Sequence, residues 1–252
     1  MAILTYLDAS GTKEHPSLSV AGFIATEERW IAFDHAWVAA LAEFGITDLH
    51  MKDFVSSRRQ FDGWDKDEPK RRRFVQRITS VINTNTDKSV GAILFVADYD
   101  EVNTVLAVRE SLGAPYTATA LYALTLAKTW IERHHSGEAM AFFVERGDTD
   151  QGELFNILRR VGFIQPVTPL DKRTVVNGVT TWVHPFQACD FIAYEMAKHA
   201  KVASALGVDS VRARQSLLQI APRERDDMWR FMNGEILREV CAAAKIPRRH
   251  RA

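Results

Sequence analysis

Two runs of apolar, β-prone residues stand at the start of the chain, with a polar segment between them. Residues 3–7 form the first run, which stops at Asp8-Ala9-Ser10-Gly11, and residues 17–25 form the second. Valine, isoleucine and phenylalanine favour strands, whereas aspartate, serine and glycine favour turns. The pattern therefore predicts two neighbouring strands connected as a hairpin.

Apolar residues recur three or four positions apart in several other segments, which is typical of amphipathic helices. These predicted helices occupy residues 30–44, 69–81, 116–135, 150–161, 185–200 and, in shorter pieces, 210–244. Pro69 and Pro185 stand where a helix begins and Gly45 where one ends, as their backbone preferences require. The end of the chain is therefore predicted to be helical.

Two further segments are dense in β-prone residues. Residues 90–97 and 139–145 predict buried strands, the first of them in the centre of the sheet. Residues 163–183 predict short strands with a tight turn at Asn177-Gly178, because Asn-Gly readily adopts positive φ angles. A hairpin followed by alternating helices and strands indicates an α/β protein whose mixed sheet is flanked by helices.

The length of 252 residues allows one elaborated α/β domain as well as two smaller ones. No internal repeat, low-complexity tract or linker divides the chain. We therefore predict a single domain over residues 1–252, with a C-terminal helical extension at about residues 205–252.

Charge and composition narrow the classes of function. Lys and Arg total 32, as do Asp and Glu, so any binding of nucleic acid depends on local clusters and not on net charge. Basic residues at 70–73 and 248–251 form such clusters, although solvated helix faces and chain ends have the same composition. The two cysteines lack metal-ligand spacing, and no segment resembles a signal peptide or a membrane span. We predict a cytoplasmic protein that does not enter a membrane.

Acidic residues stand where predicted strands end. Asp8 follows the first strand and Glu145 ends a later one, and open α/β sheets bind ligands at the carboxyl ends of their strands. Gln187 and Asp190 are three residues apart on the long helix that follows, so they share one helix face. Asp8, Glu145 and Asp190 are therefore expected to meet at one rim of the sheet.

Carboxylates that gather in one site repel each other unless a divalent cation neutralises them. Mg²⁺ and Mn²⁺ prefer oxygen ligands and assist the hydrolysis of phosphodiesters. The pattern thus favours Mg²⁺ or Mn²⁺ bound by Asp8, Glu145 and Asp190, with nucleic acid as the substrate. Each residue also has a structural interpretation, respectively a turn-forming aspartate, a surface ion-pair partner and a charge at a helix start.

Four segments, YLDASG, LHMKDF, FFVERGD and HPFQACDFIAYE, resemble in sequence and order the motif blocks of a bacterial and phage family called domain-of-unknown-function family 3800. The resemblance extends over most of the chain, to about residue 195. It implies a ribonuclease-H-like fold and metal-dependent nuclease chemistry. Two positions depart from the family pattern, since Ala9 stands where glutamate is common and Glu145 where aspartate is common.

The resemblance also implies roles for individual residues. It makes the three carboxylates the catalytic and metal-binding groups. Ser10 and Gly11 then shape the turn beside the substrate, and Gln187 supports the site or contacts the substrate with its amide. His50 lies in the second block and is expected to contact substrate or to shuttle a proton, with a hydrogen-bonded structural histidine as the alternative.

The sequence leaves more than one function open. The first is a Mg²⁺- or Mn²⁺-dependent nuclease that acts on DNA or RNA. The alternative is a non-catalytic module of a phage-related or defence complex that binds nucleic acid or protein, which Ala9 and the neutral charge favour. A hydrolase that acts on a small phosphate ester with the same metals is a third. No P-loop, dinucleotide-binding or serine-hydrolase motif occurs.

Overall fold

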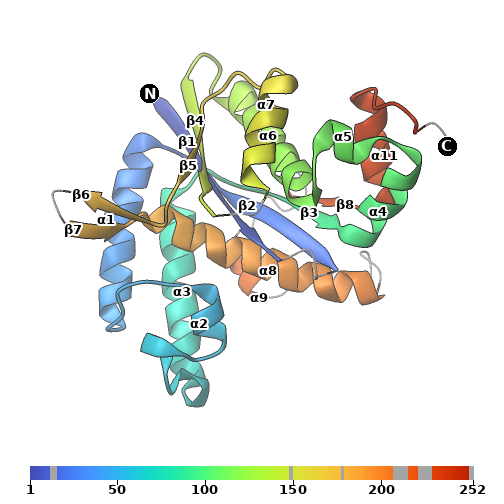
Figure 1. The fold of residues 1–252 in the computed structure, drawn as a ribbon. Coiled ribbons are helices and arrows are strands. Elements are labelled where there is room, and N and C mark those ends of the chain that lie inside the picture. The colour runs from blue at the N-terminus through green and yellow to red at the C-terminus, as the bar shows by residue number, and fades with distance from the viewer. Residues whose placement is uncertain (12–15, 148–149, 177–178, 207–214, 221–228, 250–252) are drawn as a thin grey trace.

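The computed structural model describes residues 1–11, 16–147, 150–176, 179–206, 215–220 and 229–249. A six-stranded sheet in the order β5-β4-β1-β2-β3-β8 forms the middle layer (Figure 1). Its strands are β1 (Ala2–Ser10), β2 (Ser17–Thr26), β3 (Lys88–Phe95), β4 (Ala139–Glu145), β5 (Val167–Leu170) and β8 (Trp229–Met232). A separate two-stranded ribbon pairs β6 (Arg173–Val176) with β7 (Val179–Trp182).

The strand directions make the sheet mixed. β1 is antiparallel to β2 and β2 to β3, which confirms the predicted N-terminal hairpin. β4 is parallel to β1, β5 to β4, and β8 to β3. β6 and β7 pair antiparallel, while the turn predicted at Asn177-Gly178 lies outside the described residues. The α/β class with a mixed sheet is therefore confirmed.

Helices cover both faces of the sheet (Figure 1). One face carries α1 (Glu27–Glu43), α2 (Met51–Val55), η1 (Arg59–Phe61), η2 (Trp64–Lys66), α3 (Glu68–Asn85), α8 (His184–Leu206) and α9 (Gln215–Ile220). The other carries α4 (Val96–Val105), α5 (Val108–Leu112), α6 (Pro115–His134), α7 (Gln151–Arg160) and α11 (Gly234–Ala243). Each face has its own apolar core because successive strand side chains point to opposite faces. None of the described helices is long and apolar enough to cross a membrane.

The same alternation decides which face the strand-end carboxylates occupy. Tyr6 on β1 packs in the core on the α8 side, and Asp8 follows two residues later on that side. Phe143 on β4 stacks on Tyr6 with ring centroids 4.8 Å apart, and Glu145 follows it by two residues. Because side chains along a strand alternate between the two faces of the sheet, both carboxylates point toward α8.

Helix α8 lies unusually close to the sheet where it crosses β1 and β2. Cys189 Sγ donates a hydrogen bond to the backbone oxygen of Tyr6 at 3.2 Å. Gly22 leaves the space for this approach, since a Cβ atom there would lie 1.8 Å from Tyr6 O and 2.9 Å from Cys189 Sγ. The close approach fixes Asp190, the next residue of α8, beside the end of β1.

The prediction of a purely helical C-terminal extension is wrong. Residues Trp229–Met232 form β8, an edge strand that pairs in parallel with β3. Trp229 Nε1 also donates a hydrogen bond to Ser89 Oγ of β3 at 3.1 Å. Without β8, the backbone donors and acceptors of β3 would form an uncovered edge. This pairing partner is distant in the sequence, so local periodicity cannot reveal it.

The strand predicted at residues 90–97 differs from the observed β3 in two respects. β3 ends at Phe95, and Val96 and Ala97 begin α4. β3 also lies next to the β8 edge, whereas β1 and β2 occupy the centre of the sheet. All eight β3 residues are nevertheless buried because helices cover both faces, so complete burial does not identify the central strand.

Candidate active site

Asp8 and Glu145 occupy equivalent positions at the carboxyl ends of β1 and β4. Leu7 and Val144 are the last pair in the parallel register, and the two acidic residues come next. β1 does not stop at Asp8, contrary to the prediction, because β2 continues to pair with it as far as Ser10. Adjacent strands lie about 4.8 Å apart, so the two carboxylates share one rim of the sheet as expected.

Asp190 reaches the same rim from the second turn of α8. Its Oδ2 accepts a hydrogen bond of 2.8 Å from the backbone N–H of Met51, the first residue of α2. Asp190 interacts electrostatically with Glu145 and Asp8. The structure thus brings the three predicted carboxylates together, while their catalytic and metal-binding roles stay a prediction.

Lys172 places its ammonium group among these carboxylates. Lys172 Nζ lies 2.9 Å from Glu145 Oε2 and 3.3 Å from Asp8 Oδ2. Sequence analysis missed this lysine. No local pattern pointed to it, because the pairing that sets Leu170 beside Glu145, two residues before Lys172, exists only in the folded sheet.

Burial dominates the protonation equilibria of the cluster. It raises the pKa of Asp8 well above its usual value; a hydrogen bond with Glu145 adds to this rise, and Lys172 opposes it. Burial also raises the pKa of Asp190, against the pull of Lys172 and of the Met51 N–H. For Lys172, burial favours the neutral form, yet attraction by the three carboxylates outweighs it and raises its pKa. The rim therefore holds the Lys172 cation beside two carboxyl groups, those of Asp8 and Asp190, whose pKa values are raised by burial.

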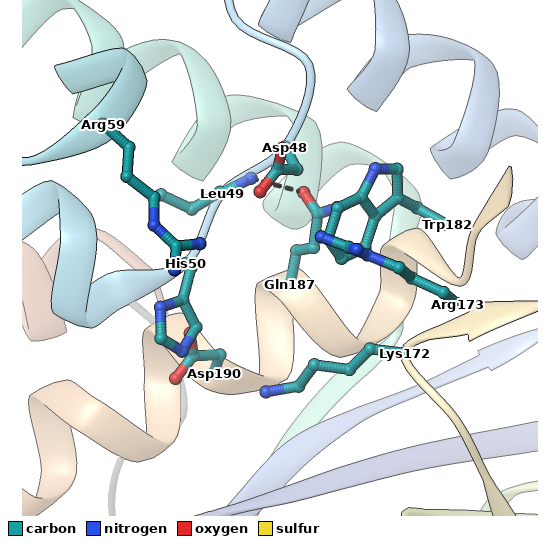
Figure 2. A pocket seen from close by; sticks show the side chains of 9 residues that line it. All are labelled: Asp48, Leu49, His50, Arg59, Lys172, Arg173, Trp182, Gln187 and Asp190. Carbon is teal, nitrogen blue, oxygen red and sulfur yellow. Dashed lines mark hydrogen bonds between the residues drawn. The ribbon is translucent and has the colours of Figure 1, made fainter. Parts of the chain in front are cut away.

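A cavity of about 360 Å³ opens beside this cluster (Figure 2). The segment around α2 and η1 contributes one part of its lining, the β6–β7 ribbon with the residue before it a second part, and α8 the third. The lining residues are Asp48, Leu49, His50, Arg59, Lys172, Arg173, Trp182, Gln187 and Asp190. The cavity thus joins cations, an indole ring and a buried amide to the acidic rim.

Two of the four residues predicted to contact substrate line this cavity. Gln187 is buried, and its Oε1 accepts hydrogen bonds from Trp37 Nε1 at 2.9 Å and from the Leu49 N–H at 2.8 Å. His50 precedes α2, and its half-exposed ring places Nδ1 3.4 Å from Asp53 Oδ2. Gln187 thus ties α8 to α1 and to the segment before α2, while His50 stands at the cavity mouth with its ring accessible.

Ser10 and Gly11 are not among the residues that line the cavity. The Ser10 carbonyl accepts a hydrogen bond from Ser19 Oγ at 3.3 Å. Gly11 has φ +100°, and a Cβ atom there would lie 2.7 Å from the backbone oxygen of Ser17. The pair shapes the end of β1 beside Asp8 as predicted, and contact with substrate stays a prediction.

The basic residues of α3 make contacts within the protein. The Arg71 guanidinium lies 4.5 Å from the centroid of the Phe54 ring and donates to the Phe54 carbonyl at 3.1 Å. Arg77 donates three hydrogen bonds to the Glu43 carboxylate. Trp64, whose ring centroid lies 4.1 Å from Lys70 Nζ, belongs to the apolar core. These contacts favour the interpretation of this cluster as a helix face.

Replacing Lys172 with Met is expected to lower the free energy of unfolding by about 2 kcal/mol at neutral pH. Asp8 and Glu145 would lose their counter-charge, but Lys172 is 25% exposed, so the cost is smaller than for a fully buried pair. Lys172→Arg, which retains the charge, serves as the control and should lose less.

Urea denaturation of both variants at several pH values measures this effect. The raised pKa of Lys172 means that its stabilisation is fully present below the pKa of the unfolded state and is lost at higher pH. Toward acidic pH, Asp8 and Asp190 take up protons, so the loss of stability caused by Lys172→Met should become smaller. Equal stability of Lys172→Met and wild type at pH 7 would contradict the ion pairs.

Within the described ranges, no group of three or more His, Cys, Asp or Glu side chains is arranged to hold a metal ion. The Lys172 ammonium supplies the positive charge between Asp8 and Glu145 instead. The chain matches no protein-family model, no curated protein and no solved structure. The resemblance to domain-of-unknown-function family 3800 therefore stays a prediction.

Proposed function

We propose that the protein is a Mg²⁺- or Mn²⁺-dependent nuclease with a ribonuclease-H-like fold, which hydrolyses phosphodiester bonds of DNA or RNA in the cytoplasm. The observation that carries this proposal is the meeting of Asp8, Glu145 and Asp190 at one rim of the sheet. They come from the parallel strands β1 and β4 and from α8, which packs across β1 and β2. Ligands of α/β sheets bind at this type of rim, and the mixed sheet flanked by helices is compatible with the proposed fold.

The chemistry of the donor set suits a hard divalent cation. All three side chains are carboxylates, the ligands that Mg²⁺ and Mn²⁺ prefer. Asp8 Oδ2 is buried, and the Lys172 ammonium lies 3.3 Å from it, so a divalent cation would replace that ammonium as its positive partner. Asp8, Glu145 and Asp190 would hold the ion, which when bound supplies Lewis acidity toward a phosphoryl group and water.

Other residues beside the rim suit a polyanionic substrate. Arg59, Lys172 and Arg173 line the cavity together with Asp190. Cations of this kind bind phosphate oxygens and orient a nucleic-acid backbone. His50 lines the same cavity with a half-exposed ring, where it can accept or donate a proton.

Crystals soaked in Mn²⁺, together with cleavage assays on DNA and RNA panels, test the proposal. The expected result is an anomalous peak in contact with Asp8, Glu145 and Asp190, and cleavage that requires the metal. Binding displaces Lys172 Nζ from between the carboxylates, which the same crystals would show. An empty rim at high Mn²⁺ concentration, with no cleavage of any polynucleotide, would contradict the nuclease.

The Lys172 ion pairs favour a second candidate, a non-catalytic module that binds nucleic acid or protein. An ammonium between Asp8 and Glu145 neutralises the rim without any metal. Thermal unfolding separates the two candidates. For the nuclease, Mg²⁺ or Mn²⁺ should raise the Tm of the wild type but not that of Asp8→Ala, because ligand binding stabilises the native state. For the module, neither protein should respond.

A further inference from the structure

The cavity beside the acidic rim is lined by a side chain with an unpaired hydrogen-bond donor. Gln187 is 2% exposed, and its Oε1 accepts from both Trp37 Nε1 and the Leu49 N–H. Indole and backbone nitrogens are donors only, so a flipped amide would oppose two N–H groups with its own NH₂. The hydrogen-bond network therefore fixes the orientation of the amide.

In this orientation the NH₂ group lacks an acceptor. Gln187 Nε2 is buried and makes no hydrogen bond with any described residue. Leaving such a donor buried and unpaired has a cost in free energy, and buried polar groups are otherwise almost always paired. Because Gln187 lines the cavity (Figure 2), a ligand that offers an acceptor there would recover this cost.

Two planar groups line the same cavity. The Arg173 guanidinium lies 3.9 Å from the centroid of the Trp182 ring. Trp182 is partly exposed, whereas Trp30, Trp37 and Trp64 are buried in the apolar core. Indole rings and guanidinium planes are the surfaces on which proteins stack unpaired nucleobases. The β6–β7 ribbon, which carries both groups, therefore presents a stacking surface at the edge of the cavity.

We infer that this cavity is a nucleobase subsite of the proposed nuclease. One base of the substrate stacks on the Trp182 and Arg173 pair, and a carbonyl on its edge accepts a hydrogen bond from Gln187 Nε2. The volume of about 360 Å³ lies in the range of small-molecule sites. The sugar and phosphate then extend toward Lys172 and Asp190, which line the cavity on the acidic side.

This inference rests on the proposed function, because it assumes that the substrate is a nucleic acid. It adds that the cavity binds some nucleobases in preference to others. Uracil, thymine, cytosine and guanine carry a ring carbonyl, whereas adenine offers only ring nitrogens as acceptors. The two hydrogen bonds to Gln187 Oε1 hold the whole amide in place. Its NH₂ group therefore cannot turn to follow an acceptor at a different position. Uridine and guanosine monophosphates are therefore expected to bind more tightly than adenosine monophosphate.

Equilibrium binding of these three mononucleotides in EDTA tests the subsite independently of metal and catalysis. Tryptophan fluorescence and chemical-shift changes report binding. Gln187→Glu is the sharpest variant, because it retains an oxygen for Trp37 and Leu49 but replaces the NH₂ donor with a second acceptor. It is expected to weaken uridine monophosphate binding about 10-fold or more, the loss caused by one unpaired group.

Variants at Trp182 provide a second measurement at a partly exposed position, which keeps the test valid if Gln187→Glu does not fold. Trp182→Ala removes the stacking surface and should weaken binding about 10-fold, whereas Trp182→Phe retains a ring and should lose less. Binding that is unchanged in the folded variants, or no mononucleotide bound by wild type at millimolar concentration, would overturn the inference.

Polynucleotide cleavage by wild type, measured in parallel with Mn²⁺, separates this inference from the proposed function. Cleavage without the expected mononucleotide binding would reject the base subsite alone. Mononucleotide binding that depends on Gln187 and Trp182, without cleavage of any polynucleotide, would reject the nuclease and support the subsite.

Discussion

Replacing Asp8 with Asn is expected to lower the rate of metal-dependent polynucleotide cleavage at least about 1,000-fold, which corresponds to about 4 kcal/mol. Asparagine retains the size of the side chain and an oxygen for the Ala9 N–H, which Asp8 Oδ1 contacts at 2.7 Å. It removes the negative charge that a divalent cation requires. Single-turnover cleavage in Mn²⁺ measures the effect.

Asp171→Asn is the matched control. Asp171 is an exposed carboxylate near the same rim, and its Oδ2 lies 3.7 Å from Arg146 Nη1. It has no contact with the acidic cluster that would give it a part in the reaction, so its loss should change the cleavage rate less than about 3-fold. Equal losses for the two variants would mean that general charge, and not the Asp8 carboxylate, supports activity.

The same Asp8→Asn variant is expected to be more stable than wild type at neutral pH. Burial raises the pKa of Asp8, so the folded state binds the proton more tightly than the unfolded state. The stability from this group is present below the unfolded-state pKa and is lost as the pH rises toward the folded-state pKa. Asparagine carries no charge at any pH, so the variant avoids this loss of stability, although Lys172 would lose one ion-pair partner.

Thermal unfolding across a pH series measures this gain. The Tm of Asp8→Asn should exceed that of wild type by about 2–4 °C near pH 8, the shift that about 1 kcal/mol causes in a protein of this size. The difference should disappear in acid, where Asp8 itself is protonated. A variant that is both inactive and less stable at pH 8 would instead indicate a structural role for the Asp8 carboxylate.

Replacing Gly22 with Ala is expected to lower the free energy of unfolding by more than about 4 kcal/mol, an effect reserved for severe disruption of the core. The added Cβ atom would lie 1.8 Å from Tyr6 O and 2.9 Å from Cys189 Sγ. One contact is with the backbone of the paired strand and the other with α8. To remove these clashes, either the β1–β2 pairing must break or α8 must move away from the sheet.

Gly152→Ala provides the control for this substitution. Gly152 is an exposed residue of α7, and no atom would lie within 4 Å of a Cβ atom there. Alanine has the higher helix propensity, so this variant should be stabilised by up to about 1 kcal/mol. Urea denaturation compares the two. A Gly22→Ala protein with wild-type stability would contradict the close approach of α8 to β1.

The local pattern of residues was sufficient to predict those helices and strands whose structure is determined by their own residues. The strand predicted at residues 139–145 has the bounds of β4, and the helix predicted at 116–135 lies within one residue of α6. Gly45, placed as a helix end, follows α1 and has φ +71°. Hydrophobic periods of 2 and 3.6 residues and turn residues are local properties, so the sequence reveals them directly.

The acidic rim was partly predictable for the same reason. Asp8 and Glu145 stand where the apolar runs of two predicted strands stop, and the rule that ligands bind at strand carboxyl ends holds before any contact is known. Helix spacing likewise placed Gln187 and Asp190 on one face. The resemblance to known motif blocks added the roles of these residues, which the geometry of the rim supports but does not test.

The sequence by itself therefore determined most helices and strands, the α/β class and the convergence of three carboxylates. Only the tertiary structure decided that Lys172 lies among those carboxylates, that Trp229–Met232 completes the sheet, and that the Gln187 amide lines a cavity without an acceptor. Each of these features joins segments that are far apart in the chain. Their contacts depend on how the chain returns to the sheet, and no local hydrophobic pattern contains that information.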